Sequence, residues 1–388
     1  MILKLKKLIK NNSNKQDSEL IEKITEYYQR ILNREPDPEG LNNALHNIKN
    51  NIMTLGRLEI SLLNSDEYKN LNLKNEEINK EEIDYFYKFI KKPIFIIGVP
   101  RSGTGLLYQA LCAHPELAWF DVDDLKLWIP ERRQEKLKKY YTKLTEQKKK
   151  FPMDEDCLAI FGRNLLNPKK FENLPPGSYP IEGETFWKLY FDSRFVEDIS
   201  NNKKFNLVKA LSDVIIRQKK SRFLNKAPQN IMRLYVIKKI FPDAIFINIA
   251  RNPRSVVSSM ITRSEKEGSF DTGIPILDVE NYNKLDSVQK WAWRYKEITE
   301  IIYEFSIQNL HQFKTVFYEE FMQNPKKIVK DIFDFCSLDI PENFEQLLPK
   351  IRDEPTKKWV QKLNKEDIEK ILEITKSSIQ KMNYPYKI

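Results

Sequence analysis

A short glycine-bearing segment carries the residues of this chain best suited to bind an anionic group. It runs from Gly98 to Gly105, contains Arg101, and follows the apolar run 94–97. The apolar residues within 106–111 fall on one face of a helix. Amides at the start of that helix have no intrahelical acceptor, and the helix dipole adds partial positive charge there. Phosphate is the natural occupant, and the Arg101 guanidinium could bridge a phosphate and a group being transferred from it.

The spacing of Gly98 and Gly103 matches a Walker loop, but the residues that follow differ. A Walker loop continues with Lys and a magnesium-binding Ser or Thr, whereas this chain has Thr104 and Gly105. We therefore expect phosphate binding without a metal. Two alternative functions stay open: a P-loop nucleotide kinase, which needs the Lys and magnesium, and a non-catalytic nucleotide-binding module.

The run Pro100 to Thr104 after a buried strand resembles the 5'-phosphosulfate loop of sulfotransferases that use 3'-phosphoadenylyl sulfate (PAPS). The family usually has a second Thr where this chain has Gly105, so a hydroxyl contact is lost while the amide remains. The resemblance implies in-line transfer of a sulfuryl group from PAPS to a hydroxyl or amine, with Arg101 as a catalytic residue. It also implies that the donor is bound by Arg101, Ser102, Gly103, Thr104, Gly105 and Leu106.

A second match to the family follows the apolar run 244–250. Arg251 lies at the end of this expected strand, and Ser259 follows it by eight residues. In the family these positions hold the 3'-phosphate. They imply that the product nucleotide, 3'-phosphoadenosine 5'-phosphate (PAP), binds better than ADP. Tyr318 is implied to line the nucleotide pocket, with simple packing as the alternative, and Lys226 could touch the donor.

The resemblance extends over about residues 93–384 and is greatest to the broad group that acts on carbohydrates, lipids and peptidyl tyrosine. We therefore expect a small-molecule acceptor or a hydroxyl or amine of a glycan or lipid. The insertion at 132–180, which we expect to cover the acceptor pocket, matches nothing specific. The sequence leaves the acceptor unidentified.

A general base must take the proton of the acceptor. Family members commonly place a Glu or His shortly after the loop helix, and here Asp123 is the first candidate, with Asp121 close behind it. Glu184 is the rival, because burial among aromatic residues could raise its pKa. Its alternative role is that of an acidic residue at a helix start. We expect His114, which precedes a proline, to be structural.

The elements that position these residues alternate between buried strands and helices. We expect strands at 94–97, 244–250 and 315–318 with helices between them. This order predicts an α/β fold, a doubly wound parallel sheet flanked by helices, with the phosphate loop at the end of one strand.

Composition shifts divide the chain into four parts. They are a basic tail at 1–16, a small all-helical module at 17–72, a linker at 73–92 and the sulfotransferase-like α/β domain at 93–388. The module resembles a short bacterial helical module of unassigned function. Its turn at 34–40, with two prolines, should end one helix and start the next.

The composition limits the partners of the chain. A net charge of +10 is compatible with binding to several kinds of polyanion. No nucleic-acid-binding module is recognisable, so we do not expect nucleic acid to be a partner. No run approaches the ~20 apolar residues of a membrane span. The basic N-terminus is expected to be a solvated tail, with weak membrane-surface contact as the alternative. Three scattered cysteines without metal-ligand spacing point to reduced thiols and a cytoplasmic protein.

Overall fold

The computed structural model describes most of the chain, which forms two compact units, Met1–Ile78 and Asn79–Ile388. The described residues are 15–32, 34–50, 80–121, 124, 180–191, 199–267, 276, 279–348 and 358–385, with Leu55, Leu58, Ser61, Leu62, Ser65 and Glu67. Asp123, Cys157 and the insertion 132–179 lie outside this set.

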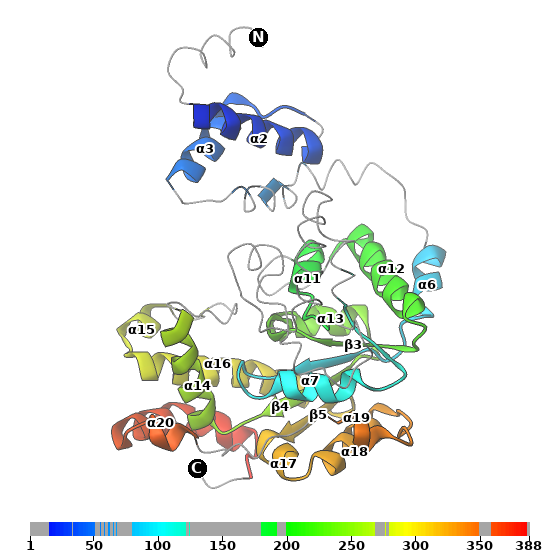
Figure 1. Cartoon of the computed structure of the whole chain (residues 1–388), viewed down its shortest axis with the longest axis vertical. Coiled ribbons are helices and arrows are strands. Elements are labelled where there is room, and N and C mark those ends of the chain that lie inside the picture. The colour runs from blue at the N-terminus through cyan, green and yellow to red at the C-terminus, as the bar shows by residue number, and fades with distance from the viewer. Residues whose placement is uncertain are drawn as a thin grey trace, which may run out of the picture. The chain divides into compact units, whose positions relative to one another are not determined.

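The second unit is built on a parallel sheet. Its described strands are β1 (Ile94–Ile97), β2 (Leu117–Ala118), β3 (Arg222–Lys226), β4 (Ile245–Ala250) and β5 (Phe313–Phe317). They pair in the order β2-β3-β1-β4-β5, and every pairing is parallel (Figure 1). The carboxyl ends of β1 and β4 therefore lie side by side at one edge of the sheet, where open α/β sheets bind their ligands.

Both faces of the sheet are covered, because successive side chains of a strand point to opposite faces. Ile94 and Ile96 belong to one buried cluster, while Phe95 and Ile97 belong to another. A strand buried on both faces reads as a continuous apolar run, and this is why 94–97 could be predicted.

Helices on either side complete the two clusters. The Ile94 side is covered by α7 (Thr104–Cys112), α17 (Tyr318–Gln323), α18 (Pro325–Cys336) and α19 (Phe344–Leu347). The Phe95 side is covered by α6 (Lys80–Tyr87), α11 (Glu184–Tyr190), α12 (Asn201–Arg217), η4 (Pro228–Arg233), α13 (Leu234–Ile240), α14 (Pro253–Glu267), α16 (Ser287–Gln308) and α20 (Lys365–Lys381). The shorter elements are α15 (Val279–Lys284), η5 (Leu310–Gln312) and η6 (Lys358–Gln361).

The predicted α/β class is confirmed, but the predicted strands need correction. The strand expected at 315–318 begins two residues earlier, at Phe313, and Tyr318 is already the first residue of α17. Strands β2 and β3 were not predicted. β2 has two residues, and β3 mixes Arg222, Asn225 and Lys226 with apolar residues, so neither shows a periodic pattern.

The first unit contains a small helical module, as predicted. Its helix α2 (Lys15–Leu32) ends before the proline-containing turn, and α3 (Pro38–Lys49) starts after it. Asp37 caps α3 by accepting a hydrogen bond of 2.8 Å from the amide of Gly40. Arg34 binds the carboxylate of Glu67 through two nitrogens, which ties the turn to a later part of the module.

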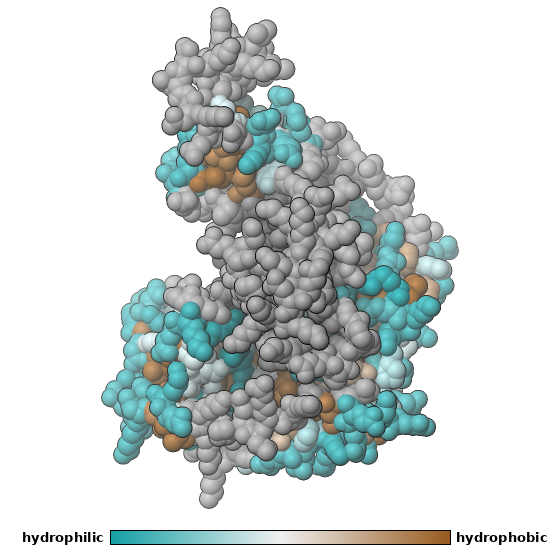
Figure 2. Space-filling model, viewed as in Figure 1, coloured by the Kyte–Doolittle hydropathy of each residue, from teal (hydrophilic) through white to brown (hydrophobic). Residues whose placement is uncertain are grey.

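The surface of the described residues is largely hydrophilic over α12, α18 and α20 (Figure 2). None of the helices in this described portion is long and apolar enough to cross a membrane. The described cysteines, Cys112 and Cys336, are buried free thiols, and burial raises the pKa of Cys336 to about 12. They act as apolar fillers.

Candidate active site

The phosphate loop connects β1 to α7 and takes a backbone shape that only glycine allows at two positions. Gly98 has φ 152°, and a Cβ there would lie 2.6 Å from the carbonyl oxygen of Ile249. Gly103 has φ 103°, and its Cβ would lie 2.4 Å from the ring of Tyr318. Contacts below about 3 Å exclude any larger residue at either position.

The start of α7 offers hydrogen-bond donors to an anion. No side chain caps this helix at Gly103, and no described residue accepts a hydrogen bond from the amides of Gly103, Thr104 and Gly105. The Ser102 hydroxyl beside them is fully buried, and its oxygen has no hydrogen-bond partner in the described part of the chain. Buried polar groups are normally bonded, so this cradle is suited to an anionic ligand. Leu106, by contrast, packs its side chain on the cluster beneath α7.

Arg101 joins the two motifs that were predicted to hold the donor. Its Nε donates a hydrogen bond of 3.0 Å to the hydroxyl of Ser259, and its carbonyl oxygen accepts one of 3.1 Å from Nη1 of Arg251. Arg101 is exposed and has φ 76°, a left-handed conformation that costs about 1–3 kcal/mol for a non-glycine residue. Residues 158 positions apart in the chain thus meet at one point.

Tyr318 packs between the two motifs. The guanidinium of Arg251 lies 4.0 Å from the centroid of the Tyr318 ring, and the edge of the same ring lies against Gly103. The side chain therefore supports both the phosphate loop and the Arg251 side chain. Such a cation–π contact also orients the guanidinium.

The turn after β4 is held from two sides. Its amide at Asn252 donates to Oε1 of Glu319 at 3.1 Å, and the carbonyl oxygen of Arg251 accepts a hydrogen bond of 3.0 Å from the Tyr295 hydroxyl. Burial raises the pKa of Tyr295, so this hydroxyl stays a donor. Arg254, one helical turn further, stacks at 4.4 Å on Trp359 of η6.

A network of buried polar side chains lies at the carboxyl end of β3. Asn225 accepts a hydrogen bond of 3.0 Å from Trp187 and one of 2.8 Å from Asn230, and Lys226 pairs with the carboxylate of Glu182. Glu182 was missed by the sequence analysis. The local signal was its place directly before Gly183, where α11 begins.

Glu184, a predicted candidate for the general base, lies next to this network. Its two carboxylate oxygens accept hydrogen bonds of 2.7 and 2.8 Å from the guanidinium of Arg233. Both side chains are buried, with 7% and 2% of their surface exposed. The ion pair ties α11 to η4, and it favours the alternative role, that of a structural acidic residue at a helix start.

The predicted aspartate cluster is only partly described. The amide of Asp121 donates at 2.6 Å to Oδ2 of Asp124, whose other oxygen pairs with Arg217. Asp121 also pairs with Pro180 in an isolated antiparallel bridge. Asp123, the first candidate for the base, lies outside the described residues.

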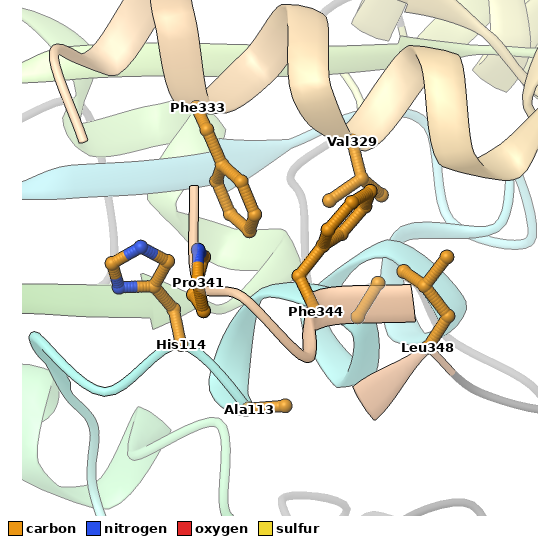
Figure 3. A pocket seen from close by; sticks show the side chains of 8 residues that line it. Ala113, His114, Val329, Phe333, Pro341, Phe344 and Leu348 are labelled. Carbon is orange, nitrogen blue, oxygen red and sulfur yellow. The ribbon is translucent and has the colours of Figure 1, made fainter. Parts of the chain in front are cut away.

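His114 lies away from the phosphate loop, at the other end of α7, in an apolar hollow (Figure 3). Its Nδ1 accepts from the amide of Glu116 at 3.2 Å, so Nε2 carries the proton that is donated at 2.8 Å to the carbonyl oxygen of Asp339. The ring lies edge-on to Phe333 with centroids 4.7 Å apart. These contacts give His114 the expected structural role.

The proteins similar to this chain include sulfotransferases of animals and bacteria. A candidate protein-tyrosine sulfotransferase of Caenorhabditis elegans is 28% identical over 127 residues, which make up 32% of this chain and 43% of that protein. A sulfotransferase of Mycobacterium tuberculosis H37Rv covers 92% of this chain and 91% of its own, with 15% identity and a TM-score of 0.47. A mouse sulfotransferase complexed with PAP covers 78% of this chain and 89% of its own chain, with 12% identity and a TM-score of 0.37. The chain thus spans less than half of the length of the curated relative.

The model of the sulfotransferase family matches residues 93–342. This span is more than half of the chain, and it includes the phosphate loop, the turn after β4 and Tyr318. The chain therefore belongs to the sulfotransferase family.

Proposed function

We propose that this protein transfers a sulfuryl group from PAPS to a hydroxyl or amine of an acceptor, most simply a glycan or a lipid. The observation that supports this best is the meeting of Arg101, Ser259 and Arg251 at the carboxyl edge of β1 and β4. Arg101 lies in the loop that leads to the open amides of α7, and Arg251 lies at the other end of the cluster. A nucleotide with a 5'-phosphosulfate and a 3'-phosphate carries anionic groups at two such points.

The proposed roles follow from what each group can donate. The amides of Gly103, Thr104 and Gly105 and the hydroxyl of Ser102 bind the 5'-phosphate, while Arg251 and Ser259 bind the 3'-phosphate. Tyr318 keeps Arg251 in place from below. Arg101 supplies a cation for the transferred group, because its side chain is exposed at the site.

The reaction is an in-line displacement at sulfur. The acceptor oxygen or nitrogen forms the new bond to sulfur, the bond from sulfur to the 5'-phosphate oxygen breaks, and that oxygen keeps the electron pair. Arg101 stabilises the charge that grows on this oxygen, and a carboxylate takes the acceptor proton. Positioning and electrostatic stabilisation supply most of the rate enhancement in such transfers.

A screen for labelled sulfate tests this proposal. The protein is incubated with PAPS that carries a sulfur isotope and with panels of glycans, lipids, phenols and tyrosine-containing peptides, and the products are analysed by mass spectrometry. We expect labelled sulfate on one class. PAP binding without transfer to any acceptor, or to water, would support the non-catalytic binding module instead. Activity with ATP that depends on magnesium would support the kinase.

A further inference from the structure

A buried ion pair lies beside the phosphate loop and takes no part in the contacts described for the donor. Lys226 is the last residue of β3 and lies opposite Ile96 of β1, two positions before Gly98. Its ammonium group pairs with Oε1 of Glu182. The two side chains are 6% and 10% exposed. A buried charge pair costs desolvation energy that an apolar pair would not, so its position at the reacting edge of the sheet invites a functional explanation.

The backbone around Glu182 is held on three sides. The amide of Ile181 donates at 2.9 Å to the carbonyl oxygen of Phe120. The carbonyl oxygen of Glu182 itself accepts a hydrogen bond of 3.0 Å from Asn225. Tyr108 of α7, the helix that begins at the phosphate loop, contacts the carbonyl oxygen of Ile181 at 3.4 Å. Glu182 is therefore fixed relative to both β3 and α7, which is what a catalytic group requires.

Glu182 differs from the neighbouring carboxylates in what its oxygens bind. Both oxygens of Glu184 are bound by Arg233, and both oxygens of Asp124 accept hydrogen bonds, from Asp121 and Arg217. In Glu182, Oε1 pairs with Lys226, and the side-chain hydrogen bonds found among the residues that the structure describes leave Oε2 unused.

The electrostatic surroundings suit proton transfer. Burial raises the pKa of Glu182, and the neighbouring ammonium of Lys226 opposes that rise. Glu184 raises this pKa further and Arg263 of α14 lowers it. A base is most effective when its pKa lies closer to the working pH than that of an exposed carboxylate.

We propose that Glu182 is the general base, which takes the proton of the acceptor through Oε2 while Lys226 holds Oε1. This inference rests on the proposed sulfuryl transfer. The acceptor O–H breaks as the oxygen bonds to sulfur, the proton passes to Glu182, and the nucleotide leaves with the electron pair of the broken S–O bond. The protonated carboxyl then releases its proton to solvent.

Glu182→Gln tests the proposal, because the amide keeps the shape of the side chain but cannot take a proton at neutral pH. Transfer from PAPS is measured to two phenols: unsubstituted phenol, which is un-ionised, and 4-nitrophenol at a pH above its own pKa. Release of sulfate to water is measured in parallel. We expect kcat with phenol and with water to fall about 10²- to 10⁴-fold, and a much smaller loss with 4-nitrophenolate, which has no proton to give.

Two controls separate this role from damage to the fold. Glu297→Gln breaks a comparable buried ion pair, in which Arg294 lies 2.7 Å from Glu297 on α16. This variant should change the transfer rates to the two phenols by the same factor. PAP affinity of Glu182→Gln should match that of the wild type. If Glu182→Gln does not fold, Lys226→Met gives a second readout: loss of the ammonium raises the pKa of Glu182, so the acid limb of the kcat/KM profile moves to higher pH.

Asp123→Asn is run beside these variants. Selective loss of phenol transfer in Asp123→Asn, with Glu182→Gln near the wild type, would overturn the proposal and return the role to the aspartate. Equal losses with both phenols, or an unmoved acid limb in Lys226→Met, would also overturn it. A wild-type protein that neither prefers PAP to ADP nor releases sulfate from PAPS would instead contradict the proposed function itself.

Discussion

Arg101 combines a left-handed backbone conformation with an exposed side chain at the site. Its Nε donates a hydrogen bond of 3.0 Å to the hydroxyl of Ser259. The amides that we propose to bind the 5'-phosphate belong to residues 103–105 and do not need this side chain. Loop shape and side-chain charge are thus separable by mutation.

Arg101→Ala should therefore lower kcat far more than it lowers PAP affinity. Arg101 contributes most when charge grows on the leaving oxygen, so its loss removes transition-state stabilisation rather than ground-state binding. Transfer rates and calorimetric titration with PAP measure the two quantities. Losses of similar size in both would assign Arg101 to binding alone.

Gly105 allows a test by gain of function. The sulfotransferase pattern has Thr here, and no described atom lies within 4 Å of a Cβ added at this position. Gly105→Thr should strengthen PAP binding about tenfold or more, since a hydrogen bond to a charged group contributes about 1.5–3 kcal/mol. Gly105→Ala, which adds the Cβ without the hydroxyl, is the matched control. Equal gains in the two variants would show that the hydroxyl does not reach the phosphate.

At this scale the sequence predicted what lies in one continuous motif. Residues 98–105 could be read because glycine spacing and the following helix are local features. The pairing of Lys226 with Glu182 could not be predicted, because it joins residues 44 positions apart in the chain. Glu184 was suggested by its aromatic neighbours. Its ion pair with Arg233 could not be predicted either, because the two residues are 49 positions apart.

Among the elements, neighbouring strands decide which motifs meet. β1 and β4 are adjacent and parallel, with Ile97 opposite Asn248, so the turns that follow them converge. Their apolar runs made both strands predictable. β3, on the other side of β1, carries polar residues into the site and for that reason lacked the pattern of a buried strand.

The buried imidazole of His114, at the C-terminal end of α7, should make the free energy of unfolding sensitive to acid. Burial lowers the pKa of this imidazole below its ordinary value. A histidine whose folded pKa is depressed contributes full stability above its unfolded pKa of about 6.5, and this contribution is lost as the pH falls toward the folded pKa. The unfolded state then binds the proton more readily.

His114→Gln should consequently flatten this part of the pH dependence. Glutamine keeps a donor for the carbonyl oxygen of Asp339 but does not titrate in this range. Urea unfolding from about pH 8 to about pH 5 compares the free energies of unfolding. The stability of the wild type should fall more steeply than that of the variant below about pH 6.5. If the free energies of unfolding of the two proteins change with pH in parallel, protonation of His114 does not contribute to the acid sensitivity.

On the scale of the whole molecule, a small helical module and a unit built on a parallel sheet share one chain. The boundary predicted from composition lies in the segment 73–92, and the chain divides into its two compact units between Ile78 and Asn79. The net charge of +10 is consistent with an anionic donor. The residues that surround the acceptor could not be predicted, since the insertion 132–180 has no recognisable pattern.

We propose that one edge of the sheet binds a nucleotide through both its 5'- and its 3'-phosphate groups. Calorimetric titration of the full chain with PAP and with ADP tests it most directly, together with Arg251→Ala. We expect PAP to bind at least about tenfold more tightly than ADP, because a charged hydrogen bond to the 3'-phosphate contributes about 1.5–3 kcal/mol, and Arg251→Ala should erase most of this difference. Equal affinity of the unmutated protein for the two nucleotides would contradict the account.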